Sequence, residues 1–144
     1  MLRARIDISQ GLDGEPLVLA CIDLSPNQIL ASAYAVAAVA ADRYRTTTMS
    51  ADDVLEFREL TALADELRAL SLQPDMATVV LPPARLAAYR MTVASFLESR
   101  DEAEWIRHED RGHMAHLREL LHPLEDICLE AMRAALSPPL QRQV

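Results

Sequence analysis

The first 24 residues alternate between apolar and polar positions in a pattern that predicts a β-hairpin. From Leu2 to Ile8, apolar residues fall on one side and charged residues on the other, which is the period of a half-buried strand. Residues 9–16 contain two glycines and a proline and supply the turn. Leu17–Leu24 follows as a second, more continuously apolar strand. Because a lone hairpin is marginally stable, we expect its apolar face to lie on helices or on further strands.

The next segment, Ile29–Ala41, is predicted to be a helix at the centre of the core. Ser25 followed by Pro26 is a typical helix start, with a capping hydroxyl and a proline at the first helical position. The alanine-rich end of the segment is apolar on every side, which predicts a helix that is buried all round. A membrane span is the alternative, but the run is short and is preceded by polar residues.

Residues 43–49 are ambiguous because Tyr44 and three threonines favour a third strand in a short segment. In such a strand Arg43 and Arg45 would share one face and could hold a carboxylate or a phosphate. The alternative is a solvated strand whose arginines offset an acidic surface. We name this pair as a candidate anion-binding site.

Apolar residues at three-four spacing predict helices over most of the remaining chain. Ser50 and Asp53 form a capping signal for a helix over 51–70, and Thr78–Leu81 is a short β-branched strand that two prolines end. A third helix is expected over 84–99. A second capping signal, over 99–102, predicts a new helix with Trp105 and Ile106 on its buried side. Gly112 could interrupt or merely weaken that helix.

The clearest periodicity is a C-terminal seam of apolar residues from Met114 to Ala135, in steps of three and four. Pro123 falls on its polar side and should kink the helix without breaking the seam. The seam could pack within one chain or against a second copy. From it we expect a homodimer.

Together these elements predict an α+β fold that is predominantly helical. An N-terminal β-hairpin, with one or two further short strands, packs against four to five helices. Residues 1–136 are expected to form a single compact domain, and 137–144 a frayed C-terminal tail.

Composition excludes several kinds of mechanism. All 14 basic residues are arginine, so Schiff-base chemistry and a P-loop lysine are impossible, and three glycines are too few for the glycine-rich nucleotide loops. A net charge of −8 disfavours nucleic acid and anionic membrane surfaces as partners. Two widely separated cysteines and an opening without a long apolar run predict a cytoplasmic protein. No cofactor is implied.

One helical constellation could bind a metal ion. Glu109, His113 and His116 follow i, i+4, i+7 spacing, which places a carboxylate and two imidazoles on one side of a helix, provided that the helix continues through Gly112. The plainer alternative is a set of boundary histidines that make local hydrogen bonds and bind nothing.

The sequence thus predicts a non-catalytic, acidic interaction or accessory module that associates with itself, with an unknown protein partner. No nucleophile elbow or acid–base spacing points to an enzyme. The alternative function is a small-ligand or metal-binding protein that uses the Glu/His/His cluster.

Overall fold

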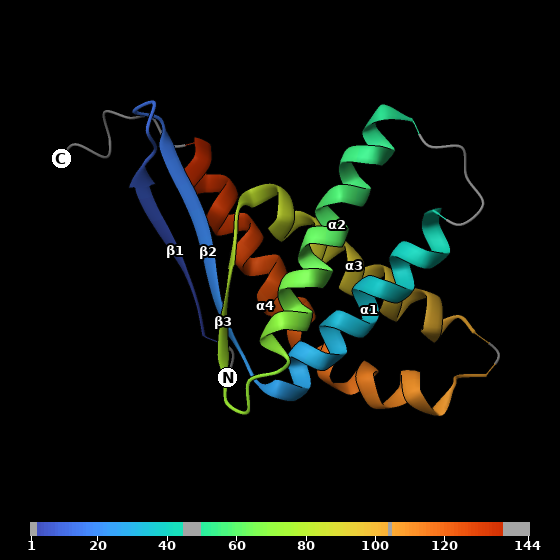
Figure 1. Ribbon diagram of the computed structural model, residues 1–144. Helices are drawn as coiled ribbons and strands as arrows, with labels where there is room; N and C mark the ends of the chain where they lie inside the picture. Colours follow the sequence, from blue (N-terminus) through green and yellow to red (C-terminus); the bar gives the residue numbers. More distant parts are fainter. Residues whose placement is uncertain (1–2, 45–49, 104, 137–144) are drawn as a thin grey trace.

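The computed structural model describes residues 3–44, 50–103 and 105–136, and of Arg43 and Tyr44 only the backbone. The elements are β1 (Arg3–Gln10), β2 (Pro16–Leu24), α1 (Pro26–Tyr44), α2 (Ala51–Leu70), β3 (Ala77–Leu81), α3 (Pro83–Asp101) and α4 (His108–Leu136). Four helices pack against a three-stranded antiparallel sheet in these residues (Figure 1). The predicted α+β, predominantly helical fold is therefore confirmed.

The sheet has the order β1-β2-β3, and both neighbouring pairs are antiparallel. The predicted hairpin is confirmed, and β3 is the predicted short strand. In the hairpin turn, the Gly11 N–H donates to the Glu15 carbonyl at 2.8 Å and the Gly14 N–H donates to the Gly11 carbonyl at 3.0 Å. Gly14 has φ of +82°, a left-handed conformation that glycine adopts without a steric penalty.

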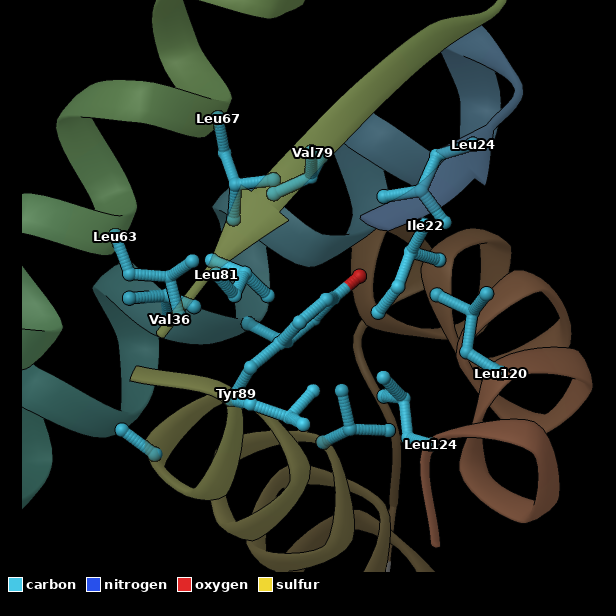
Figure 2. Packing of buried hydrophobic residues seen from close by; sticks show 14 of the residues in the cluster. Ile22, Leu24, Val36, Leu63, Leu67, Val79, Leu81, Tyr89, Leu120 and Leu124 are labelled. Carbon is cyan, nitrogen blue, oxygen red and sulfur yellow. The ribbon is translucent and has the colours of Figure 1, made fainter. Parts of the chain in front are cut away.

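The helices pack against one face of the sheet, called here the inner face. Ile22 and Leu24 of β2 and Val79 and Leu81 of β3 project from this face into the core; Val79 lies beside Leu67, and Ile22 lies on the side of Leu120 (Figure 2). The opposite, outer face carries the alternate residues of each strand, namely Arg3, Arg5, Asp7, Ser9, Leu17, Leu19, Cys21, Asp23, Thr78 and Val80. The core therefore lies between the inner face and the helices.

Helix α1 begins as predicted but is not buried all round. The Ser25 hydroxyl caps it by accepting a hydrogen bond from the Gln28 N–H at 3.2 Å. Its buried side includes Ala31 and Ala35, whose small side chains allow neighbouring helices to approach closely, whereas Leu30 is 48% exposed. The prediction was wrong because an alanine-rich helix of uniform composition does not reveal which side faces water. No helix among the described residues has the length and apolar character needed to cross a membrane.

The boundaries of α2 agree with the prediction, but the α3–α4 junction differs. Ser50 and Asp53 form the predicted capping box at the start of α2. Ser99, expected to cap a new helix, lies inside α3, where its hydroxyl donates to the Phe96 carbonyl at 3.0 Å. Trp105 lies before α4 and is 73% exposed, so its predicted burial is wrong, while Ile106 is half-buried. A local capping pattern cannot outweigh the continued packing of α3 on the core.

Helix α4 is continuous through Gly112 and Pro123. Its buried stripe comprises Asp110, Met114, Leu117, Leu120, Leu124, Ile127 and Ala131. These residues pack against the sheet, α1 and α3 of the same chain. Of the two interpretations of the C-terminal seam, packing within the monomer is the one observed.

The segment that was expected to be a third strand starts in a helix instead. Arg43 and Tyr44 form the end of α1, because each residue added to an existing helix gains a main-chain hydrogen bond. The remaining part, 45–49, lies outside the described residues, as does the predicted tail 137–144.

Candidate functional site

Asp110, in the first turn of α4, is the one charged residue of the described chain that is buried, with 5% of its surface exposed. Its Oδ1 accepts a hydrogen bond from the Tyr34 hydroxyl at 2.6 Å, and its Oδ2 accepts one from Arg100 Nε at 3.1 Å. Burying a carboxylate without such partners would be strongly destabilising. The carboxylate therefore joins α4 to α1 and α3.

Arg100, near the end of α3, is the cationic centre of this cluster. Its guanidinium lies 4.6 Å from the centre of the Phe96 ring, a cation–π contact that also shields it from water. Its Nη1 donates to the Ser99 hydroxyl at 2.9 Å and lies 3.8 Å from Oδ2 of Asp42. Arg100 thus links the end of α1 to the start of α4.

Tyr34 of α1 supplies the aromatic side of the cluster. Its ring stacks on His113 with centroids 4.4 Å apart and meets Phe96 edge-on at 5.9 Å. The hydrogen bond to Asp110, together with burial, raises the pKa of Tyr34 above its ordinary value of 10.0. A general acid or base works best with a pKa near the operating pH. Tyr34 therefore acts as a hydrogen-bond donor here. Its raised pKa is unfavourable for a general acid or base.

A cavity of about 510 Å³ opens beside this cluster, where α1, α3 and the start of α4 meet. Its lining includes Asp42, Arg100 and Asp110, and the exposed ring of Trp105 lies at the same opening. The volume is within the usual range for a small-ligand pocket. Arg100 already pairs with Asp42 and Asp110, however, so the cluster primarily stabilises the meeting point of three helices.

This cluster is not predicted by the sequence patterns described above, although one signal for it is present. Asp110 lies four residues before Met114 and seven before Leu117, on the same stripe of α4. A carboxylate that continues a buried apolar stripe requires a partner in the folded chain. The partner is Tyr34, which lies 76 positions before Asp110 in the sequence. Helical spacing cannot identify a partner on another helix.

The predicted metal ligands lie on one uninterrupted helix, as that prediction required. Their side chains nevertheless have different neighbours. His113 stacks on Tyr34, and Nδ1 of His116 lies 3.6 Å from Oε1 of Glu119, while Glu109 is exposed. Within the described ranges, no three His, Cys, Asp or Glu side chains are grouped so as to hold a metal ion. A site at Glu109, His113 and His116 stays a prediction, which elemental analysis after dialysis would test.

The predicted anion site is only partly within the described residues. The backbone of Arg43 belongs to the last turn of α1 and not to a strand, and Arg45 is among the residues not described. Anion binding by this pair also stays a prediction.

Two hollows lie along α3. One, of about 770 Å³, separates α2 from α3 and has Leu55, Ala84 and Ala87 in its lining. The other, of about 270 Å³, lies between α3 and α4 beside Cys128, and Arg90 lines both. Burial raises the pKa of the Cys128 thiol, which disfavours the reactive thiolate. Charged side chains also line both hollows, with Glu56, Arg58 and Glu59 at the larger one and Glu125 at the smaller one.

The sheet offers a different kind of surface. Of the eight residues of β1, only Ile6 is half-buried and the others are exposed. Ile8 is 50% exposed, and Leu17 of β2 and Val80 of β3 are also exposed. Among the described residues β1 pairs with β2 alone, so its second edge presents unpaired main-chain groups. Such an edge is a template for pairing with another chain.

Comparison of the chain with models of protein families, with curated protein sequences and with solved structures found no match.

Proposed function

We propose that this protein is a non-catalytic interaction or accessory module that associates with itself as a homodimer. The observation that carries this proposal is the long exposed edge of β1. Every residue of that strand except Ile6 is exposed, and the strand has a neighbour on one side only in the described chain. A second strand on this edge would satisfy its main-chain groups and cover Ile8.

We do not place self-association at the C-terminal seam, because most of its residues are already used inside the monomer. Leu117, Leu120 and Leu124 are fully buried against other elements of the same chain. Exposing them to a second copy would require the monomer to lose its core. The proposed contact is therefore at the sheet.

Charge and cysteine chemistry support a protein partner in a reducing compartment. A net charge of −8 repels nucleic acid and anionic lipid, so we infer that neither is a partner. Cys21 and Cys128 are both free thiols, as is usual in the cytoplasm. We therefore propose a cytoplasmic location.

Light scattering coupled to size-exclusion chromatography tests the proposal. The chain mass is 16.0 kDa, and we expect the measured mass to approach twice this value as concentration rises from the micromolar to the millimolar range. A mass of one chain throughout that range would refute self-association. Leu55→Glu, on the α2–α3 hollow away from the sheet, is the control and should leave the mass unchanged.

A further inference from the structure

The hydrogen-bonding direction of each β1 residue follows from the hairpin turn. Gly11 donates its N–H to Glu15, so Gly11 and Glu15 face each other as a hydrogen-bonded pair. Bonded and non-bonded pairs alternate along an antiparallel ladder, and therefore the odd-numbered residues of β1 bond to β2. Pro16, which has no N–H, lies opposite Gln10 in a non-bonded pair, as this alternation requires.

The even-numbered residues of β1 consequently direct their N–H and C=O groups away from β2. These residues are Ala4, Ile6, Ile8 and Gln10, and the side chains of the first three lie on the inner face. The outer-face side chains of β1 are Arg3, Arg5, Asp7 and Ser9. The exposed edge therefore combines outward main-chain groups with a charged pattern on one face.

We propose that two copies join by antiparallel pairing of β1 with β1, about a two-fold axis that passes through Ile6. This inference rests on the proposed self-association and specifies its surface and register. Ile6 faces Ile6 of the second copy, and Ala4 faces Ile8, so that outward main-chain groups meet in hydrogen-bonded pairs. The two sheets become one continuous sheet.

Charge selects this register over its neighbours. With the axis at Ile6, Arg5 faces Asp7 of the second copy, and the symmetry repeats this opposite-charge pair. These are non-bonded positions, where facing side chains come closest. An axis at Arg5 pairs Arg3 with Asp7 twice but places two Arg5 side chains directly opposite each other at its centre, and an axis at Asp7 places two aspartates opposite each other. Like charges directly opposite each other are destabilising. An axis placed midway between two residues would pair odd-numbered with even-numbered positions. Inner-face side chains of one copy would then lie beside outer-face side chains of the other.

β1 is also better suited to this contact than β3, the other outer strand of the sheet. β1 has eight residues and β3 has five, so β1 offers more main-chain groups. In addition, β1 carries two arginines and one aspartate in a chain whose net charge is −8. The charge of this edge is therefore opposite in sign to that of the whole chain, which reduces the repulsion between two acidic copies that meet here.

Exchanging the charges on the outer face of β1 tests whether β1 forms the dimer contact and whether the axis passes through Ile6. Arg5→Asp and Asp7→Arg each convert the two attractive cross-strand pairs into repulsive ones, and each variant should weaken the dimer by about tenfold or more. The double variant Arg5→Asp/Asp7→Arg restores opposite charges across the axis at Ile6 and should dimerise like the original protein. An equal mixture of the two single variants should form mixed dimers.

The outcomes separate this inference from the proposed function. If the original protein is monomeric, both fail. If it dimerises and the single variants dimerise equally well, β1 is not the contact and self-association stands. If the single variants are weakened but the double variant is not restored, the axis does not pass through Ile6. Circular dichroism spectra like that of the original protein would show that the variants are folded; melting temperatures are not the control, because weakening the dimer lowers them by mass action.

Ala4→Pro provides a second test that does not depend on charge. Ala4 is exposed and directs its N–H outward, so proline there removes a donor from the dimer contact but none from the β1–β2 ladder. We expect loss of the dimer and retention of the monomer fold. Ala4→Ser keeps the N–H and should remain dimeric. A fully dimeric Ala4→Pro protein would overturn the β1 contact.

Discussion

The hydroxyl of Tyr34 and the carboxylate of Asp110 are joined by a hydrogen bond of 2.6 Å that links α1 to α4. The two residues are 76 positions apart, and Asp110 is buried at the helix junction. Arg100 completes the arrangement from α3 at 3.1 Å. The junction of three helices is therefore built around one buried carboxylate.

Removing the Tyr34 hydroxyl should destabilise the protein measurably. Tyr34→Phe keeps the ring that stacks on His113 but takes a donor from the buried carboxylate of Asp110. We expect the free energy of unfolding to fall by about 1.5–3 kcal/mol in urea denaturation. Thr78→Val removes a hydroxyl that donates to Asp23 at an exposed position and should cost less than about 0.5 kcal/mol. If both variants lost the same free energy of unfolding, the burial of the Asp110 carboxylate would not explain the effect of Tyr34→Phe.

Alkaline pH should destabilise the fold through its tyrosines. Burial raises the pKa of Tyr89 above 10.0, and the Asp110 hydrogen bond raises that of Tyr34. Above pH about 10 the unfolded chain loses these protons while the folded chain keeps them, so stability is lost as pH rises. Urea denaturation from neutral pH to strongly alkaline pH should show this decline. Tyr34→Phe and Tyr89→Phe should each make the fall in the free energy of unfolding with pH less steep. If neither variant changes this pH dependence, the two tyrosines are not its cause.

The buried stripe of α4 should behave as part of the monomer core. Leu124→Ala removes a fully buried side chain and should lower the free energy of unfolding by about 2–5 kcal/mol. Leu129→Ala, on an exposed side of the same helix, should have a much smaller effect. The loss of stability in each variant should be the same at protein concentrations that favour the monomer and at those that favour the dimer. A loss seen only at concentrations that support dimers would mean that the stripe is an intermolecular contact.

Two glycine substitutions should have opposite effects. Gly14→Ala places a side chain at φ of +82° in the hairpin turn and should destabilise the protein by about 1–2 kcal/mol. Gly112→Ala lies inside α4, where an added Cβ meets no atom within 4 Å, and should stabilise it by about 0.5–1 kcal/mol. Thermal and urea denaturation would measure both. Destabilisation by Gly112→Ala would indicate that α4 requires glycine at that point.

Local patterns were sufficient for most elements but not for every boundary. The alternation before Ile8, the Ser50 capping box and the seam after Met114 each predicted an element that the structure contains. These signals act over a few residues, so they do not depend on the rest of the chain. The predicted break at Ser99 and the burial of Trp105 were wrong, because tertiary packing determines where α3 ends and which side chains it covers.

From sequence alone, the protein could be assigned an α+β class, a hairpin and a set of amphipathic helices, since periodicity reflects which side of each element avoids water. Only the tertiary structure decided that the α4 stripe belongs to the monomer and that Asp110 meets Tyr34. It also left one edge of β1 exposed among the described residues. The reason is that periodicity reports the environment of an element, whereas the identity of its neighbour depends on the path of the whole chain.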